Sequence, residues 1–234
     1  MAFSFDSRIR YSEVDSSCRL SLTGLTNYFQ DCSVFHSQSH DVGIRFLADN
    51  HIAWVLSSWQ ICINRLPLLN EQVKISTWAY GMKAFYGYRN FTLEDAGGST
   101  LAYANSVWAY MDMKKGRPVR PSAEEVDPYG SGEPLEMDYQ PRKIKLPESA
   151  VKKEPFAVRK YHIDTNEHVN NCQYVQMAME YIEHTGDIRQ VRVEYKNSAV
   201  YGDIIVPKVA AEETRTVVEL CDESDRIFAT VEFS

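Results

Sequence analysis

The two halves of this 234-residue chain carry the same features in the same order, and this internal repeat limits the fold more than any other feature of the sequence. When Asp15 is aligned with Asp164, Arg10 falls on Arg159. In each half a short strand-like segment leads through a polar turn into a helical pattern, and a run of strands follows. The repeat therefore predicts two similar units in tandem.

Prolines mark the boundary between the two halves. Seven of the nine prolines lie between Pro118 and Pro155, together with many other turn-forming residues. A structureless loop of this length is unusual inside one compact domain, and proline stiffens such a segment toward extended conformations. We therefore expect an N-terminal unit over residues 1–121, a Pro-rich surface linker over 122–150 and a C-terminal unit over 151–234.

Each half contains one apolar helical pattern followed by strands. Apolar spacing predicts helices around Leu22–His36 and Tyr174–Ile182, each apolar over more than one stripe. Alternating runs and turn residues predict strands at 54–63, 73–78, 89–95 and 101–111, and again at 191–195, 204–209, 214–221 and 226–233. An antiparallel sheet wrapped around a long central helix buries both elements. The prediction is an α+β double (tandem) hotdog; an unrelated α+β protein fits less well, because the order of elements agrees in both halves.

Composition narrows the classes of function. With a formal net charge of −7 and a pI near 5.4, the chain lacks the basic character of most nucleic-acid binders. No apolar run approaches the roughly 18–20 residues that cross a bilayer, and the N-terminus does not resemble a leader, so we expect a cytoplasmic protein without membrane segments. Five cysteines without a CxxC pair indicate reduced thiols, and we expect neither a metal site nor a cofactor.

The densest polar cluster precedes the second helix. Asp164, Asn166 and His168 alternate, so an extended backbone would point all three side chains to one side. Asn170 or Asn171 would cap the helix, whose first amides could polarise a carbonyl oxygen. A histidine with an orienting carboxylate, an amide and an oxyanion site supplies most of what acyl transfer to water needs.

The first half lacks most of this cluster. Asp15 is followed by Ser16-Ser17-Cys18-Arg19, which keeps the aspartate but has neither the asparagine nor the histidine. A purely structural cluster, with a capping turn and a packed histidine, should appear in both copies. We therefore expect a fold-building role for the two aspartates and a catalytic role specific to the second half.

The segment from Asp164 to Tyr174 is similar to the Asp-x-Asn-x-His-Val-Asn-Asn-x-x-Tyr signature of the acyl-acyl carrier protein (acyl-ACP) thioesterases of plants and bacteria. The resemblance covers nearly the whole chain, including Glu194-Tyr195-Lys196 and Gly202-Asp203. It implies hydrolysis of fatty acyl-ACP to free fatty acid, which ends chain elongation. It also implies that Asp164, Asn166 and His168 are catalytic, with His168 and Asp164 activating water.

One departure from the family pattern concerns the nucleophile. Plant members carry a Glu-Cys pair where this chain has Ser198 and Ala199, which excludes a cysteine nucleophile at that position. Ser198 could hold a water, and Glu194 is a less favoured accessory carboxylate. Cys172 in the first turn of the helix is interpreted as a packing residue.

The resemblance also implies where the acyl chain and the carrier bind. The acyl chain is expected in the first hotdog, with Leu25, Phe29 and Trp54 as candidates for the pocket floor. An acidic carrier needs a basic surface, although any one basic run can be an ordinary solvated loop. The candidate docking residues surround the linker: Lys114, Lys115, Arg117, Arg120, Arg142, Lys143 and Lys145.

Three other functions are kept as alternatives. An acyl-CoA thioesterase shares the fold and the chemistry. A hotdog dehydratase would move protons within the acyl chain without releasing a thiol, and a non-catalytic acyl-binding module would release none either; Asn166 and His168 disfavour the latter. Assembly into a homodimer is left open, because the tandem copy could already provide the pairing that single hotdogs need.

Overall fold

The computed structural model describes residues 2–182 and 188–234. The chain forms two compact units, Met1–Ser57 with Ile63–Tyr139, and Ser58–Cys62 with Gln140–Ser234. The second unit therefore includes a piece of strand β2 (Ile52–Ile63), far from the rest of that unit in sequence.

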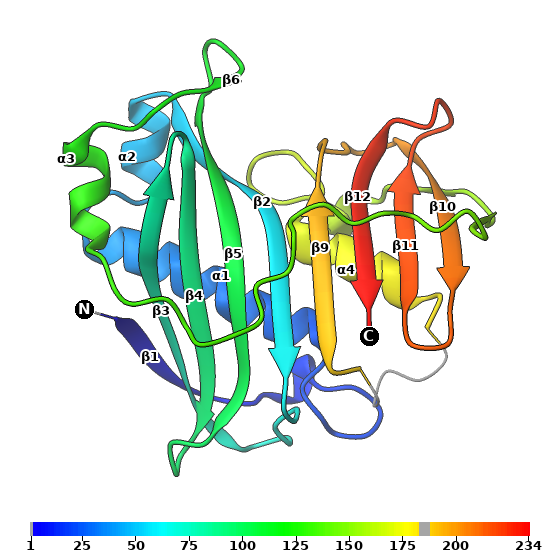
Figure 1. Ribbon diagram of the computed structural model, residues 1–234, viewed down its shortest axis with the longest axis horizontal. Coiled ribbons are helices and arrows are strands. Elements are labelled where there is room, and N and C mark those ends of the chain that lie inside the picture. Colours follow the sequence, from blue (N-terminus) through cyan, green and yellow to red (C-terminus); the bar gives the residue numbers. More distant parts are fainter. Residues whose placement is uncertain (1, 183–187) are drawn as a thin grey trace. The chain divides into compact units, whose positions relative to one another are not determined.

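In the first unit, antiparallel strands lie in the order β1-β3-β4-β5-β2 (Figure 1). Helix α1 (Leu22–Ser39) crosses one face of this sheet and contacts β1 and β3. Shorter elements are the 3₁₀ turn η1, helix α2 and strand β6. Their bounds and those of the strands are β1 Phe3–Arg8, β3 Gln72–Lys83, β4 Tyr86–Asp95, β5 Thr100–Asp112, η1 Tyr11–Glu13, α2 Ile44–Asp49 and β6 Arg117–Pro118.

Helix α1 forms where the apolar spacing predicts it. Ser21 caps its first turn, because the Ser21 side chain accepts a hydrogen bond from the Gly24 N–H at 3.0 Å. The predicted stripe is buried along the whole helix, and the ring of Phe29 lies 5.3 Å from that of Phe91 on β4. Burial of this stripe holds the helix on the sheet.

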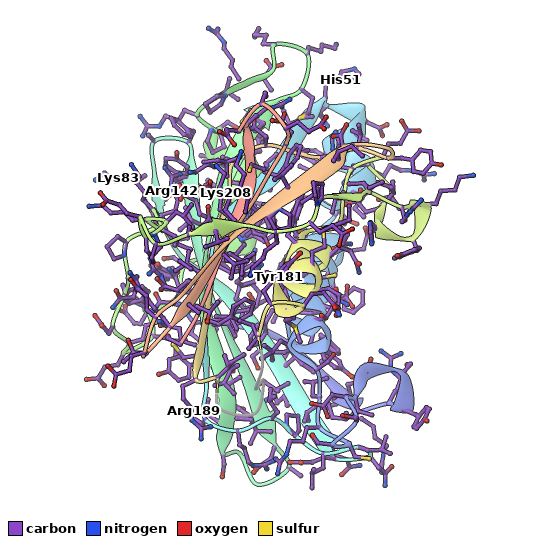
Figure 2. The ribbon with its side chains drawn as sticks, turned by 90° about the vertical axis from the view of Figure 1, so that its right-hand side faces the viewer. His51, Lys83, Arg142, Tyr181, Arg189 and Lys208 are labelled. Atoms are coloured by element: carbon purple, nitrogen blue, oxygen red, sulfur yellow. The ribbon has the colours of Figure 1, made fainter. Side chains whose placement is uncertain are left out.

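In the second unit, β9 pairs with β12, which is followed by β11, β10 and β7, and Ser58–Cys62 pairs with the other side of β9. Helix α4 (Asn171–Met179) contacts β11 and β12. Seen edge-on, α4 with Tyr181 lies on one side of these strands, and Arg142 and Lys208 lie on the other (Figure 2). The remaining bounds are β7 Val151–Lys152, β8 Phe156–Ala157, η3 Lys160–His162, β9 Gln190–Tyr195, β10 Ile204–Ala211, β11 Thr216–Cys221 and β12 Ile227–Phe233.

The predicted second helix is shorter than its apolar pattern. It ends at Met179, and the amides of Tyr181 and Ile182 bond to carbonyls three residues earlier, at 3.2 and 3.1 Å. This tighter turn closes the helix, as is common at helix ends. The strands predicted in both halves are all present with similar bounds.

The Pro-rich segment forms hydrogen bonds first with residues of one unit and then with residues of the other. It begins with α3 (Ala123–Val126) and η2 (Asp127–Tyr129), and Tyr129 is buried. The Gly132 amide then donates to the carbonyl of Ala79 at 2.8 Å, and the indole of Trp78 donates to the carbonyl of Glu133 at 2.7 Å. The segment up to Tyr139 thus belongs to the first unit.

Beyond Tyr139, the same segment crosses the sheet of the second unit. Ile144 is buried, and its amide donates to Glu194 on β9 at 3.1 Å. Arg192, also on β9, donates to the carbonyl of Pro141. The segment therefore covers the face of this sheet opposite α4 (Figure 1). Among the described residues, no helix combines the length and hydropathy needed to cross a membrane.

Candidate active site

The signature segment before α4 is a tight turn. The Asp164 amide donates to the carbonyl of His168 at 2.8 Å, and the Glu167 amide donates to the carbonyl of Asp164 at 3.1 Å. Glu167 has a φ of 61°, in the left-handed region. The extended backbone expected from the alternation of Asp164, Asn166 and His168 is therefore wrong. Asp164 Oδ1 instead accepts the Asn166 amide at 2.8 Å, as turn-forming aspartates do.

The first unit contains the same turn. The Asp15 amide donates to the carbonyl of Arg19 at 2.8 Å, the Cys18 amide donates to the carbonyl of Asp15 at 3.0 Å, and Cys18 has a φ of 58°. Asp15 Oδ1 accepts the Ser17 amide at 2.8 Å. Both aspartates therefore shape the turn, as expected, while the residue at the end of the turn is arginine in one copy and histidine in the other.

The repeat continues into the loop that supports each turn. The amide after the turn bonds to the loop carbonyl in both units, Val169 to Ala199 at 2.9 Å and Leu20 to Pro67 at 2.8 Å. The loop then turns at Gly202 in the second unit, with a φ of 90°. The two copies thus share a backbone scaffold and differ in the side chains that this scaffold presents.

Those side chains surround an open cavity of about 600 Å³ in the second unit. Asn166 is exposed and His168 is half-buried at its wall. The other lining residues were not singled out from the sequence: Lys160, Ile163, Glu167, Val200 and Tyr201. The Nζ of Lys160 lies 5.8 Å from the centroid of the Tyr201 ring. The position of Tyr201 beside the Gly202-Asp203 turn was the available signal.

The structure brings Asn166 and His168 together at this cavity, and Asp164 does not line it. No hydrogen bond joins the Asp164 carboxylate to the His168 imidazole within the described part of the chain, and the imidazole bonds to no other described residue. His168 is therefore available to a ligand in the cavity, whereas Asp164 acts on it through the backbone of the turn.

Several backbone groups at the N-terminus of α4 already bond within the protein. Asn170 is the cap, since its Oδ1 accepts the Cys172 amide at 3.0 Å and its carbonyl accepts the Gln173 amide at 2.9 Å. The Asn170 amide itself donates to the carbonyl of His162 at 2.9 Å, and the carbonyl of Asn171 accepts the Tyr195 hydroxyl at 3.0 Å. These bonds stabilise the helix start, and the oxyanion role expected of Asn170 and Asn171 stays a prediction.

Two accessory residues lie outside the cavity. Glu194 is buried beneath the Pro-rich segment, on the opposite face of β9 from Tyr195, so it does not meet His168. Ser198 is exposed in the loop before Ala199 and does not line the cavity. Cys172 is buried in α4, which agrees with its interpretation as a packing residue.

Comparison with known proteins identifies the family. Residues 2–129 match the family described as the acyl-ACP thioesterase N-terminal domain, and residues 144–232 match the acyl-ACP thioesterase C-terminal domain. The chain belongs to the acyl-ACP thioesterase family. Among curated family members, a chloroplastic acyl-[acyl-carrier-protein] hydrolase of Cuphea viscosissima is 26% identical over 87% of this chain and 53% of its own length. A chloroplastic oleoyl-acyl carrier protein thioesterase of Arabidopsis thaliana is 25% identical over 90% of this chain and 63% of its own length.

Solved structures confirm the tandem hotdog fold. An acyl-ACP thioesterase from Bacteroides thetaiotaomicron has a TM-score of 0.91 at 24% identity and covers 99% of this chain and 96% of its own. A protein of Lactobacillus plantarum described as an oleoyl thioesterase has a TM-score of 0.86 at 27% identity, covering 100% and 95% of the two chains. This acyl-ACP thioesterase family chain spans about half the length of the first plant relatives, 53% and 55%.

The residues expected to bind the acyl chain in this family lie in the first unit. Leu25 and Phe29 are fully buried on α1. Trp54 is half-buried, and its ring lies 4.7 Å from Tyr110 and 6.3 Å from Tyr129. Leu25 and Phe29 pack in the core here, and contact of all three residues with an acyl chain stays a prediction.

The basic residues expected to dock the carrier are all exposed, with Lys115 paired to Asp112 at 3.0 Å. Those at 114–120 belong to the first unit and those at 142–145 to the second. Their joint role in docking stays a prediction.

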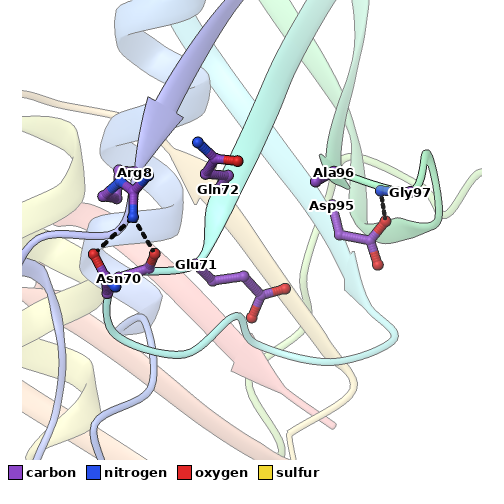
Figure 3. Close-up of a pocket in the computed structure, with 7 residues that line it drawn as sticks. All are labelled: Arg8, Asn70, Glu71, Gln72, Asp95, Ala96 and Gly97. Atoms are coloured by element: carbon purple, nitrogen blue, oxygen red, sulfur yellow. Dashed lines mark hydrogen bonds between the residues drawn. The ribbon is translucent and has the colours of Figure 1, made fainter.

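A second, polar depression of about 470 Å³ lies at the strand ends of the first unit (Figure 3). Arg8 crosses it and donates to the side chain and carbonyl of Asn70, at 2.9 and 3.2 Å. None of the predicted site residues lines it. Among the described residues, no group of three His, Cys, Asp or Glu side chains is arranged to hold a metal ion.

Proposed function

We propose that this chain hydrolyses the thioester of fatty acyl-ACP and releases free fatty acid, which would end elongation of the chain. Membership of the acyl-ACP thioesterase family supports the substrate class. The observation that carries the proposal is the pair of matched turns: only the second presents an asparagine and a histidine, and it presents both to one open cavity.

The chemistry follows from the groups at this cavity. His168 takes a proton from a water molecule, whose oxygen attacks the thioester carbonyl carbon. Asn166 holds the water or the carbonyl oxygen through its amide. The tetrahedral intermediate then collapses, the carbon–sulfur bond breaks, and the thiolate leaves with the proton that His168 returns. Asp164 keeps His168 and Asn166 in place by holding the turn.

The substrate enters as an amphipathic arm. Phosphopantetheine carries a phosphate at the carrier end and amides along its length. The cavity wall has a cation at Lys160 and an apolar surface at Val200 and Tyr201, which suits such an arm. Coenzyme A carries the same arm, so acyl-CoA is the competing substrate, and the choice between the two carriers is a matter of docking outside the cavity. The expected cytoplasmic location also stays a prediction.

Thiol release from a panel of acyl-ACP substrates tests the proposal, with the matching acyl-CoA compounds assayed beside them. His168→Ala should lower kcat/KM by about 10²–10⁴-fold, which is what a general base supplies. Arg19→Ala changes the equivalent position of the first unit and should leave kcat/KM near the wild-type value, and so should Glu194→Gln.

Near-normal turnover by His168→Ala on long-chain acyl thioesters would reject this active site. A higher kcat/KM for acyl-CoA than for acyl-ACP would identify acyl-CoA as the preferred substrate and leave the proposed chemistry unchanged. Binding of acyl thioesters without thiol release by the wild type would favour an acyl-binding module.

A further inference from the structure

Arg89 carries a charged group into the interior of the first unit. It lies on β4, on the side that faces α1, and is 8% exposed. Its Nη1 donates to Nδ1 of His36 at 2.8 Å and to Oγ1 of Thr77 at 3.2 Å. The N–H groups on Nε and Nη2 have no hydrogen-bond partner among the residues that the structure describes. Three donors of this largely buried residue are therefore unused by the described part of the protein, although they are not among its fully buried unpartnered atoms.

The charge of Arg89 has no counter-ion among the residues that the structure describes. Burial lowers its pKa to about 10, so it is still charged at neutral pH. Burial also lowers the pKa of His36 to about 3 and raises the pKa of the Cys32 thiol to about 12, so both neighbours are uncharged. No carboxylate forms an ion pair with Arg89 in the described part of the chain. The positive charge is therefore uncompensated.

A second unsatisfied polar group lies beside it. The hydroxyl of Tyr129 is buried and has no hydrogen-bond partner among the described residues, while the Arg89 guanidinium lies over the Tyr129 ring, 5.3 Å from its centroid. The ring also contacts His36 at 5.8 Å and Trp54 at 6.3 Å. Phe3 stacks on His36 at 5.5 Å. The guanidinium thus lies over one aromatic ring, and further rings pack against that ring and against His36.

Both features cost stability, because the charge of Arg89, 8% exposed, loses most of its hydration and the buried Tyr129 hydroxyl loses its own, without a partner among the described residues. Groups of this kind are retained where they meet something other than the protein. The unused donors need oxygen acceptors, the charge needs an anion, and the aromatic surroundings suit an aliphatic chain. We propose that Arg89 and Tyr129 form a subsite inside the first unit that binds the carboxylate of an aliphatic acid.

Two sources could supply this carboxylate. One is the released fatty acid, bound by its head group, and the other is an acyl chain that carries a second carboxylate at its far end. Both present the same group to Arg89 and the Tyr129 hydroxyl. This subsite goes beyond the proposed hydrolysis, since it uses no residue of the turn that holds His168.

Calorimetric titration of the intact protein with decanoate tests the subsite, with decan-1-ol as the uncharged amphiphile of equal length. The wild type should prefer decanoate by about tenfold or more, the value of a charged hydrogen bond in a buried site. Tyr129→Phe removes a hydroxyl that has no partner among the described residues, so it should keep the fold and weaken decanoate binding. Arg89→Met should abolish the preference without lowering the Tm, because it removes an uncompensated charge.

If Arg89 has only a structural role, Arg89→Met should lower the Tm, and Tyr129→Phe should keep the wild-type preference for decanoate over decan-1-ol. That result would overturn the proposal. Equal affinity of the wild type for decanoate and decan-1-ol would also overturn it. His168→Ala should bind decanoate like the wild type, so failure of the hydrolysis proposal leaves this test intact.

Two further assays separate the sources. Inhibition of thiol release by decanoate, lost in Tyr129→Phe, identifies the product. A higher kcat/KM for ω-carboxydecanoyl than for decanoyl thioester, lost in the same variant, identifies the substituted chain.

Discussion

Loss of stability in mild acid should depend on one buried histidine. Burial lowers the pKa of His36 to about 3, and the nearby Arg89 adds to this shift. The unfolded chain has the ordinary value of 6.5. As the pH falls, the histidine of the unfolded state is therefore protonated before that of the folded state. The contribution of neutral His36 to the free energy of unfolding is complete above pH 6.5 and is lost as the pH falls toward 3.

The size of the effect follows from these two pKa values. At pH 5 the unfolded histidine is about 1.5 units below its pKa, while the folded one is still neutral. At about 1.4 kcal/mol per unit, the free energy of unfolding should fall by about 2 kcal/mol between pH 7.5 and pH 5 through His36 alone. His36→Gln keeps an acceptor for Arg89 but does not titrate, so its stability should fall by about 2 kcal/mol less over this range.

Urea denaturation followed by tryptophan fluorescence measures this difference, because Trp54, Trp78 and Trp108 lie in the first unit. His51→Asn is the control. His51 is exposed with a φ of 54°, a conformation that asparagine tolerates. If His36→Gln and the wild type lose the same stability between pH 7.5 and pH 5, then His36 is not held neutral by its surroundings.

Two further predictions use the repeat and its supporting loop. Asp164→Ala and Asp15→Ala remove the same turn hydrogen bond, so each should lower the free energy of unfolding in urea by about 1 kcal/mol, but only Asp164→Ala should slow thiol release. Equal activity in the two variants would mean that the turn does not position the catalytic side chains. Tyr174→Phe removes the acceptor of the buried Ala199 amide, at 2.9 Å, and should cost about 1–3 kcal/mol. Because that loop forms a cavity wall, KM should rise more than kcat falls. Unchanged kinetics would mean that the loop does not contribute to substrate binding at the site.

The regular elements could be read from the sequence because their signals are local. The apolar spacing of α1 and the alternation of β4 and β5 survive into the structure, since burial of one face enforces both periods. The duplication was also visible, and the structure extends it to individual hydrogen bonds such as those of Asp15 and Asp164.

The geometry of the site could not be read in the same way. Parity along the chain points Asp164, Asn166 and His168 together only if the backbone is extended, and the left-handed φ of Glu167 breaks that condition. Glutamate gives no signal for such a conformation, as glycine or asparagine would.

Contacts between segments that are distant in the sequence could not be predicted either. Arg89 meets His36 across 53 residues, and Ile144 meets Glu194 across 50 residues. Hydrophobic periodicity in the sequence predicts neither contact, because each depends on how an irregular segment or a helix packs against a sheet.

The short stretch Ser58–Cys62 has a consequence for anyone who divides this chain. It runs antiparallel to β9 and belongs with the second unit, although it comes from the sequence of the first. A cut within the Pro-rich segment would therefore leave β9 with a row of unbonded amides and carbonyls. Such a bare strand edge recruits other chains, so the C-terminal half produced alone should self-associate. Fusing residues 58–62 to this C-terminal half would restore the strand that pairs with β9.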